Sequence, residues 1–146
     1  METKFNFKSA ICTDKIQSER LLSLGLKKET ADMALIENWE YDLKDGKFFT
    51  GEYFERPIDY VEGMTGHYIP AWSLHRLIEM MPDCLEMKDK ENYTWKYLFR
   101  LSHVQVVYEV YLYERRFSEM DNIYNNIIDC IEWLIKEGHF NKEYLV

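Results

Sequence analysis

Residues 68–82 read YIPAWSLHRLIEMMP, and the rest of the chain is best understood outward from this stretch. Proline fixes its own φ near the helical value, so Pro70 suits the first turn of a helix. Proline also keeps the preceding residue out of the helical region, so Pro82 predicts the end of that helix. The apolar side chains between the two prolines recur at helical spacing and predict one buried face, formed by Leu74, Leu77, Ile78 and Met81.

The clearest strand pattern follows this predicted helix. Apolar and polar side chains alternate over residues 93–102 and again over 104–112, which is typical of strands with one buried face. If the chain reverses at residues 102–103, Lys96 falls opposite Glu109, and this charge pairing supports the register. Ser-His is not a preferred two-residue turn, so a longer loop is also compatible with the pattern. The register pairs Phe99 with Val106, Tyr97 with Tyr108 and Trp95 with Val110 on the inner side.

The chain also predicts a helix near each end. At the C-terminal end Asp121 or Ser118 can cap a helix that Gly138 terminates, and its apolar stripe is Ile123, Ile127, Cys130, Ile131 and Leu134. At the N-terminal end Thr13 or Asp14 can cap a helix, and Asp14 has capping-box spacing to Gln17. The apolar side of this first helix is expected to be Ile16, Leu21 and Leu24.

Gly25 is expected to end the first helix, with Leu26 folding back onto Leu21 in a Schellman-type stop. A second short helix is expected over about residues 28–33, which makes an N-terminal helical hairpin. The fold class is therefore α+β, in which a small antiparallel sheet is packed by helices. The last helix and the helix of residues 72–81 are expected to cover one face of the sheet.

The segment between residues 37 and 68 has the weakest periodicity. Alternating side chains and the turn signal Asp45-Gly46 predict a hairpin there, followed by a long irregular connection through residues 51–66. Aromatic rings that no periodic face can bury leave an apolar patch, and such patches commonly mark interfaces. The alternative is a lid that folds back over the core. The interaction surface predicted here consists of Trp39, Tyr41, Phe48, Phe49, Tyr53 and Phe54.

Composition bounds the class of protein. A chain of 146 residues with 47% hydrophobic residues fits a single domain over residues 1–146. The formal net charge of -8 disfavours nucleic acid and anionic lipid as partners. Three cysteines without a dense framework, and the lack of a signal-peptide pattern or a long apolar run, predict a cytoplasmic protein with no membrane contact.

Three segments carry a resemblance to known proteins. These are residues 17–33, the IPAWSL sequence at 69–74, and the CIEWLI sequence at 130–135 with KEYL at 142–145. In order and spacing they resemble a group of small uncharacterised proteins of phages and mobile elements of gut bacteria. The resemblance implies an intracellular α+β protein. It implies no activity and no catalytic residue, and residues 38–66 lie outside it.

The reactive side chains do not form a recognisable catalytic motif. Zinc sites need ligands that converge on one ion, whereas no two of His67, His75, His103 and His139 lie within four residues of each other. Convergence of His67 with His75 or Cys84, and a nucleophilic Cys84 with His75 as base, are minor alternatives. Glu52 with Glu55, and Glu86 with Asp89, are expected to be solvated surface. We therefore predict no catalytic residue, no cofactor and no metal.

Two function classes remain beside the one we favour. The helix–Gly–helix pattern of residues 18–33 is compatible with a helix-turn-helix, but Lys27 and Lys28 are balanced there by Glu29 and Asp32. An enzyme of unrecognised type is the other alternative. We expect a small intracellular accessory or interaction protein without catalysis. Its partner would be another protein or a second copy in a homodimer.

Overall fold

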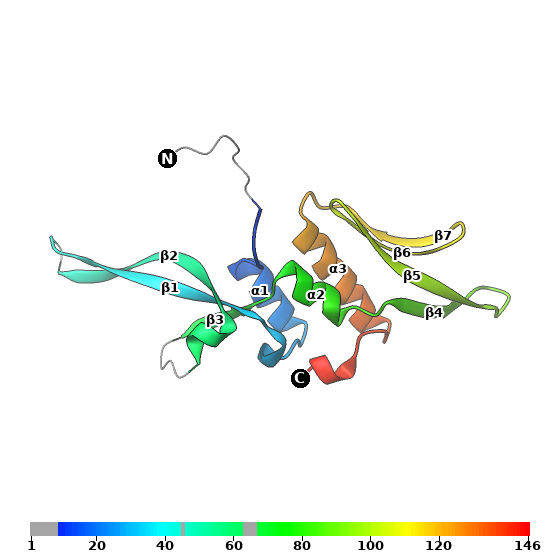
Figure 1. The fold of residues 1–146 in the computed structure, drawn as a ribbon, viewed down its shortest axis with the longest axis horizontal. Helices are drawn as coiled ribbons and strands as arrows, with labels where there is room; N and C mark the ends of the chain where they lie inside the picture. The colour runs from blue at the N-terminus through cyan, green and yellow to red at the C-terminus, as the bar shows by residue number, and fades with distance from the viewer. Residues whose placement is uncertain (1–8, 45, 63–66) are drawn as a thin grey trace.

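The computed structural model describes residues 9–44, 46–62 and 67–146, and it shows an α+β fold. Two antiparallel sheets lie at opposite ends of the molecule, and the helices occupy the space between them (Figure 1). The α-helices are α1 (Lys15–Ser23), α2 (Leu74–Met80) and α3 (Ile123–Lys136), and short 3₁₀ turns cover Lys28–Thr30, Ile58–Val61 and Lys142–Tyr144. Among the described residues no helix is both long enough and apolar enough to cross a membrane.

The first sheet has three strands in the order β2-β1-β3, formed by β1 (Met33–Asp42), β2 (Lys47–Pro57) and β3 (Tyr68–Ala71). The predicted hairpin is confirmed, and β1 and β2 form a long ribbon that projects away from the helices (Figure 1). Gly46 has φ +63° in its turn, whereas Asp45 lies outside the described residues. The predicted irregular connection is wrong over residues 51–57, because β2 continues to Pro57.

The helix predicted from Pro70 starts later than expected. Pro70 lies in β3, an edge strand that pairs with β1, where proline is tolerated because no ladder partner needs its missing N–H. Ser73 is the N-cap of α2, and its Oγ accepts a hydrogen bond from the Arg76 N–H at 3.1 Å. The predicted end before Pro82 is confirmed. The buried face of this segment is formed by Leu77, Met80 and Met81, with Leu74 and Ile78 partly buried.

The second sheet is a meander in the order β4-β5-β6-β7. Its strands are β4 (Cys84–Lys88), β5 (Thr94–Ser102), β6 (Gln105–Val110) and β7 (Tyr113–Phe117). The predicted hairpin is confirmed as β5 and β6, but its register is wrong by two residues, since Phe99 pairs with Tyr108. The turn is His103–Val104, and His103 has φ +47° at the position where type II′ turns need a positive φ.

A shift of two residues leaves every side chain on its predicted face, because strand side chains alternate with a period of two. Glu109 still meets a cation on the outer face, but this cation is Arg100, at 2.9 Å, and not Lys96. The neighbouring strands β4 and β7 were not predicted. The inner face, which we define as the face toward α3, therefore has one strand more on each side than expected.

The helix ends follow mostly from single residues. Asp14 caps α1 in a capping box with Gln17, as predicted, and Gly25 ends α1 with φ +103°. The Leu26 N–H donates to the Leu21 carbonyl at 3.2 Å, which completes the predicted Schellman stop. Gly138 ends α3 with φ +78°, also as predicted.

Three predictions about the helices are wrong. Ile16 does not join the apolar side of α1, because it is 78% exposed. The second helix of the N-terminal hairpin is only the 3₁₀ turn Lys28–Thr30, after which the chain enters β1. The N-cap of α3 is Asn122 and not Asp121 or Ser118.

The main core joins the second sheet to the helices. Ile127, Ile131 and Leu134 of α3 are fully buried against the inner face, where Val106 and Tyr108 are also fully buried. The predicted coverage of the sheet by the last helix is thereby confirmed. Further members of this core are Leu77 and Met80 of α2, and Leu21 and Leu26 at the end of α1.

Trp72 is the buried centre that connects the first sheet to this core. Its backbone exchanges hydrogen bonds with Thr13, through the Thr13 N–H to the Trp72 carbonyl at 2.9 Å and the Trp72 N–H to Thr13 Oγ1 at 3.1 Å. The indole Nε1–H donates to Thr30 Oγ1 at 2.9 Å. Trp72 therefore holds the chain before α1 through its backbone and the turn after α1 through its side chain.

Candidate interaction surface

The reactive side chains singled out in the sequence lie apart. His75 is exposed on α2, and its Nε2 lies 2.9 Å from the Glu79 carboxylate. Cys84 is exposed on the edge strand β4, and no hydrogen bond joins it to His75 in the described part of the chain. Within residues 9–44, 46–62 and 67–146 no group of three or more His, Cys, Asp or Glu side chains is placed to hold a metal ion.

The two other cysteines pack in the interior, as predicted. Cys12 and Cys130 are buried, and burial raises the pKa of the Cys12 thiol to about 12, with a smaller contribution from the nearby carboxylate of Glu55. Burial likewise raises the pKa of Cys130. A thiol needs to ionise to become a nucleophile, so the environment of both residues opposes that role.

The aromatic residues predicted to form an interaction surface divide into two groups. Tyr53 packs beside Leu35 and Ala71, and Phe54 packs beside the buried cluster of Ala34, Ile36 and Val61. These two rings therefore pack on small clusters within their own sheet, which are separate from the main core that the lid alternative would cover. The side chains of the other four lie outside the described residues, and an interface there stays a prediction for Trp39, Tyr41, Phe48 and Phe49.

A different aromatic surface lies on the inner face of the second sheet. On β7 the side chains of Phe117 and Arg115 point toward this face, because Phe117 belongs to the main core and Arg115 reaches the Trp133 ring of α3. Tyr113 shares the face, since every second residue of a strand lies on the same side. Trp95 of β5 meets Tyr113 with ring centroids 6.1 Å apart. We name the following set the aromatic strip: Trp133, Phe117, Arg115, Tyr113, Trp95 and Tyr111.

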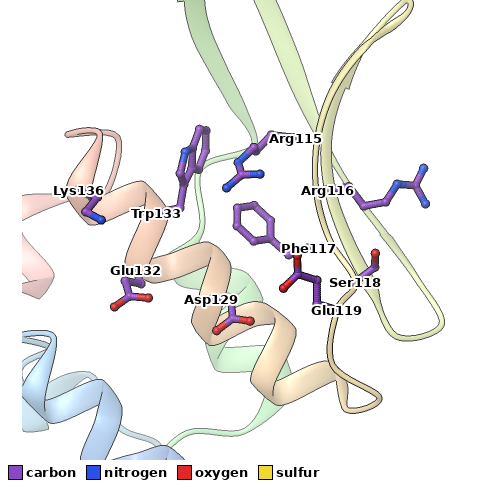
Figure 2. A pocket seen from close by; sticks show the side chains of 9 residues that line it. All are labelled: Arg115, Arg116, Phe117, Ser118, Glu119, Asp129, Glu132, Trp133 and Lys136. Carbon is purple, nitrogen blue, oxygen red and sulfur yellow. The ribbon is translucent and has the colours of Figure 1, made fainter.

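The first half of the aromatic strip forms one wall of a cleft between β7 and α3, with a volume of about 360 Å³. The Arg115 guanidinium carbon lies 4.8 Å from the Phe117 ring centroid and 5.6 Å from that of Trp133 (Figure 2). The two rings are 5.8 Å apart. Arg116 points the other way, toward the outer face, where it pairs with the Glu114 carboxylate at 3.0 Å.

Two of the carboxylates that line this cleft have ion-pair partners, whereas two of its cations have none among the described residues. The carboxylates of Asp129 and Glu132 both contact Arg20 of α1, at 2.8 and 3.1 Å. Arg115 and Lys136 have no carboxylate within 4.0 Å among the described residues. Arg115 stacks on rings, which leaves the N–H groups at the edge of its guanidinium plane available to an acceptor.

The second half of the aromatic strip continues beyond α3. Tyr111 in the β6–β7 turn meets Trp95 edge to face, with centroids 5.7 Å apart and planes at 86°. Tyr111 is 87% exposed and Tyr113 is 51% exposed, and Leu112 between them is 97% exposed. A hollow of about 700 Å³ lies beside these rings, lined also by Tyr93 and Tyr97.

Asp89 holds the Trp95 indole in place. Its Oδ2 accepts the indole Nε1–H at 2.8 Å, and its Oδ1 accepts the backbone N–H groups of Glu91 and Tyr93 at 2.9 and 3.0 Å. These hydrogen bonds, of which the one from Trp95 contributes most, hold the pKa of the Asp89 carboxyl below its usual range. The ring is therefore fixed before any partner arrives, which lowers the entropy lost on binding.

The aromatic strip could not be found from the sequence because β7 was not predicted. Arg115 interrupts the apolar side of that strand, so the alternation of Tyr113 and Phe117 reads as a loop. The available signal was the pair of tyrosines Tyr111 and Tyr113, neither of which belongs to the apolar face predicted over residues 104–112. Comparison of the chain with protein-family models, with curated proteins and with solved structures gave no match.

Proposed function

We propose that this protein is a small accessory protein that acts by binding another protein through the aromatic strip, without catalysing a reaction. The observation that supports this is the presence of two groups of rings on the same face of the second sheet. Phe117 and Trp133 contact each other at the main core, and Trp95 contacts Tyr111 and Tyr113 near the exposed β6–β7 turn. Contiguous exposed apolar surface of this kind commonly marks an interface.

The residue types favour a protein partner. Trp, Tyr and Arg are the side chains most often responsible for interface affinity, and the two aromatic ones bury a large area at little cost in side-chain entropy. Arg115 adds a cation whose N–H groups suit a carboxylate, although the chain as a whole carries a net charge of -8. A partner segment with apolar side chains and a carboxylate would match this surface.

The experiment is an affinity capture that compares matched variants. Tyr113→Ala and Arg115→Ala each remove one exposed member of the aromatic strip, and Leu43→Ala removes an apolar side chain that is 89% exposed on another part of the molecule. The expected result is a partner that wild type and Leu43→Ala retain and that both strip variants lose. A partner retained by all four proteins would place the interface elsewhere, and the predicted surface at Trp39, Tyr41, Phe48 and Phe49 would be next.

The choice of extract follows from the resemblance of residues 17–33, 69–74 and 130–145 to proteins of phages and mobile elements. A bacterial cytoplasm is accordingly the proposed setting. The nucleic-acid alternative rested on a second N-terminal helix, and a single 3₁₀ turn occupies that position.

A further inference from the structure

The edge strand β4 has backbone groups that no strand of the described chain receives. The Phe99 N–H donates to the Asp83 carbonyl, and the Asp89 N–H donates to the Tyr93 carbonyl, both at 2.9 Å. In an antiparallel ladder alternate residues face the partner, so Asp83, Leu85, Met87 and Asp89 direct their N–H and C=O groups toward β5. The backbone groups of Cys84, Glu86 and Lys88 therefore point to the free edge, and these three side chains are exposed.

The side chains along this edge are complementary to themselves. Glu86 and Lys88 lie two residues apart on the outer face, and an antiparallel copy centred on Met87 places each Glu86 opposite the Lys88 of the other copy. A copy centred on Glu86 would instead place two glutamates together. Lysine on an edge normally discourages pairing, but here the neighbouring glutamate turns that repulsion into attraction.

The other free edge of the sheet has the same charge pattern on its outer face, where Glu114 and Arg116 lie two residues apart, but it differs on its inner face. By the same alternation the backbone groups of Glu114 and Arg116 point outward from β7. A copy centred on Arg115 would bring two guanidinium groups together on the inner face, where like charges directly opposite each other repel. Glu114 and Arg116 are moreover already paired with each other, at 3.0 Å.

From these observations we infer that two copies of this chain pair through their β4 edges, in antiparallel register about Met87, to form one continuous eight-stranded sheet. Two ladder pairs, Glu86 with Lys88 in each direction, supply main-chain hydrogen bonds and opposite charges. The Met87 side chains of the two copies meet on the inner face, where Met87 is only half buried in the single chain. Leu85 and Trp95 continue that apolar surface within each copy.

The dimer places the two aromatic strips on the same face of one sheet. From Trp95 to its counterpart the sheet crosses three strand spacings, about 14 Å in all. The β4 edge borders the proposed partner site, because Lys88 lines the hollow beside Trp95. Self-association and partner capture are separate measurements, so the two proposals can fail separately.

Sedimentation equilibrium of the full chain over a wide concentration range tests the dimer, with charge exchange at the proposed contact. Lys88→Glu puts two pairs of glutamates opposite each other, and Glu86→Lys puts two pairs of lysines there. Each variant alone is expected to dimerise at least about tenfold more weakly than wild type. Mixing the two variants restores opposite charges at both pairs, and so does the double exchange Glu86→Lys with Lys88→Glu.

Two controls separate a specific effect at the β4 contact from a general effect of charge or of stability. Glu114→Lys makes the same charge change on the β7 edge and should leave the dimer intact. Because Glu86 also faces Lys96 within the chain, thermal unfolding of every variant is compared with wild type. Lys88 faces the uncharged Thr94, so Lys88→Glu still tests the dimer contact if Glu86→Lys lowers the stability of the single chain.

Several results would overturn the inference. One is a wild-type chain that stays monomeric at the highest concentration. Another is a dimer that Lys88→Glu leaves unchanged, including one that Phe48→Ala with Phe49→Ala abolishes, since that dimer would use the β1–β2 hairpin. A third is association of the wild type into species larger than a dimer, together with a mixture of Lys88→Glu and Glu86→Lys that does not regain dimerisation. That outcome would indicate β4-to-β7 pairing, which does not close.

Discussion

Asn126 shows how a single polar side chain can be fully buried within an apolar helix stripe. Its Nδ2 donates to the carbonyls of Val104 and Met120, at 2.6 and 3.0 Å, and its Oδ1 accepts the Met120 N–H at 3.0 Å. Asn126 thereby connects α3 to the β5–β6 turn and to the loop that precedes the helix. Helical periodicity identifies a buried position but does not identify its partners, so this role was not predictable from the sequence.

Asn126→Ala is expected to lower the free energy of unfolding by about 3 kcal/mol, because three hydrogen bonds worth roughly 1 kcal/mol each are lost. The adjacent Asn125 is a matched control. It is half buried, and its side chain accepts one bond from the Gln17 Nε2–H at 3.0 Å, so Asn125→Ala should cost about 1 kcal/mol. Urea unfolding measures both. Equal losses in the two variants would contradict the role given to Asn126.

Asp89 provides a pH-dependent contact within the aromatic strip. Hydrogen bonds from Trp95 and from two backbone N–H groups lower the pKa of Asp89 in the folded chain from the ordinary 3.8. A lowered folded pKa means that the contact contributes stability above the unfolded pKa, and that this contribution is lost as the pH falls through the folded pKa. The Trp95 indole N–H resonance should therefore shift with a midpoint below pH 3.8, and Asp89→Asn should remove that titration. A midpoint at or above 3.8 would contradict the contact.

At the scale of elements, packing of α3 on the second sheet is expected to dominate stability. Ile131 is fully buried in the main core, so Ile131→Ala should lower the free energy of unfolding by about 2–5 kcal/mol. Ile16→Ala is the same change on α1 at a position 78% exposed, and it should stay within about 0.5 kcal/mol. The midpoints of chemical unfolding compare the two. An unchanged midpoint for Ile131→Ala would exclude the shared core.

The elements that sequence reasoning identified are those with a long, uninterrupted period. The α3 stripe and the alternation of β5 and β6 extend over many residues, and these elements were predicted. The second alternation was predicted too long, because β6 ends at Val110 and Leu112 is exposed in the turn that follows. Register within the hairpin was not, because it depends on which residue accepts a positive φ, and His103 takes that conformation without being a typical turn residue. A register error of two residues leaves the predicted face of each side chain correct, whereas the predicted cross-strand pairs are wrong.

Short elements were missed or misassigned for a different physical reason. β3, β4 and β7 contain four or five residues each, too few for a period to stand out from chance. Their strand conformation comes from tertiary partners, as where Pro70 pairs beside β1. The prediction of an N-terminal helical hairpin was wrong for a similar reason. Residues 28–33 carry helix-forming side chains, but from Met33 onward the chain pairs with β2 and β3 as a strand. The candidate surface was missed because it depends on β7.

For the whole molecule, charge predicts how it behaves toward nucleic acid. The net charge is -8, and the turn Lys28–Thr30 that replaces the would-be recognition helix is too short to enter a major groove. A fluorescence-anisotropy titration with duplex DNA at physiological salt should show no complex at micromolar protein. Tight binding that weakens steeply with added salt would overturn this expectation and revive the nucleic-acid alternative.

The way α1 is attached has a consequence for the order in which the molecule folds. The strands β4 to β7 each pair with their neighbour in the sequence, and α3 follows directly, so this half can form through short loops. The contacts of α1 with α3, such as Arg20 with Asp129, join residues 109 positions apart. Closing so long a loop costs more chain entropy than closing a hairpin, and it gains little until α3 is in place. We therefore expect α1 to dock late in folding and to be the first helix released when the native state opens.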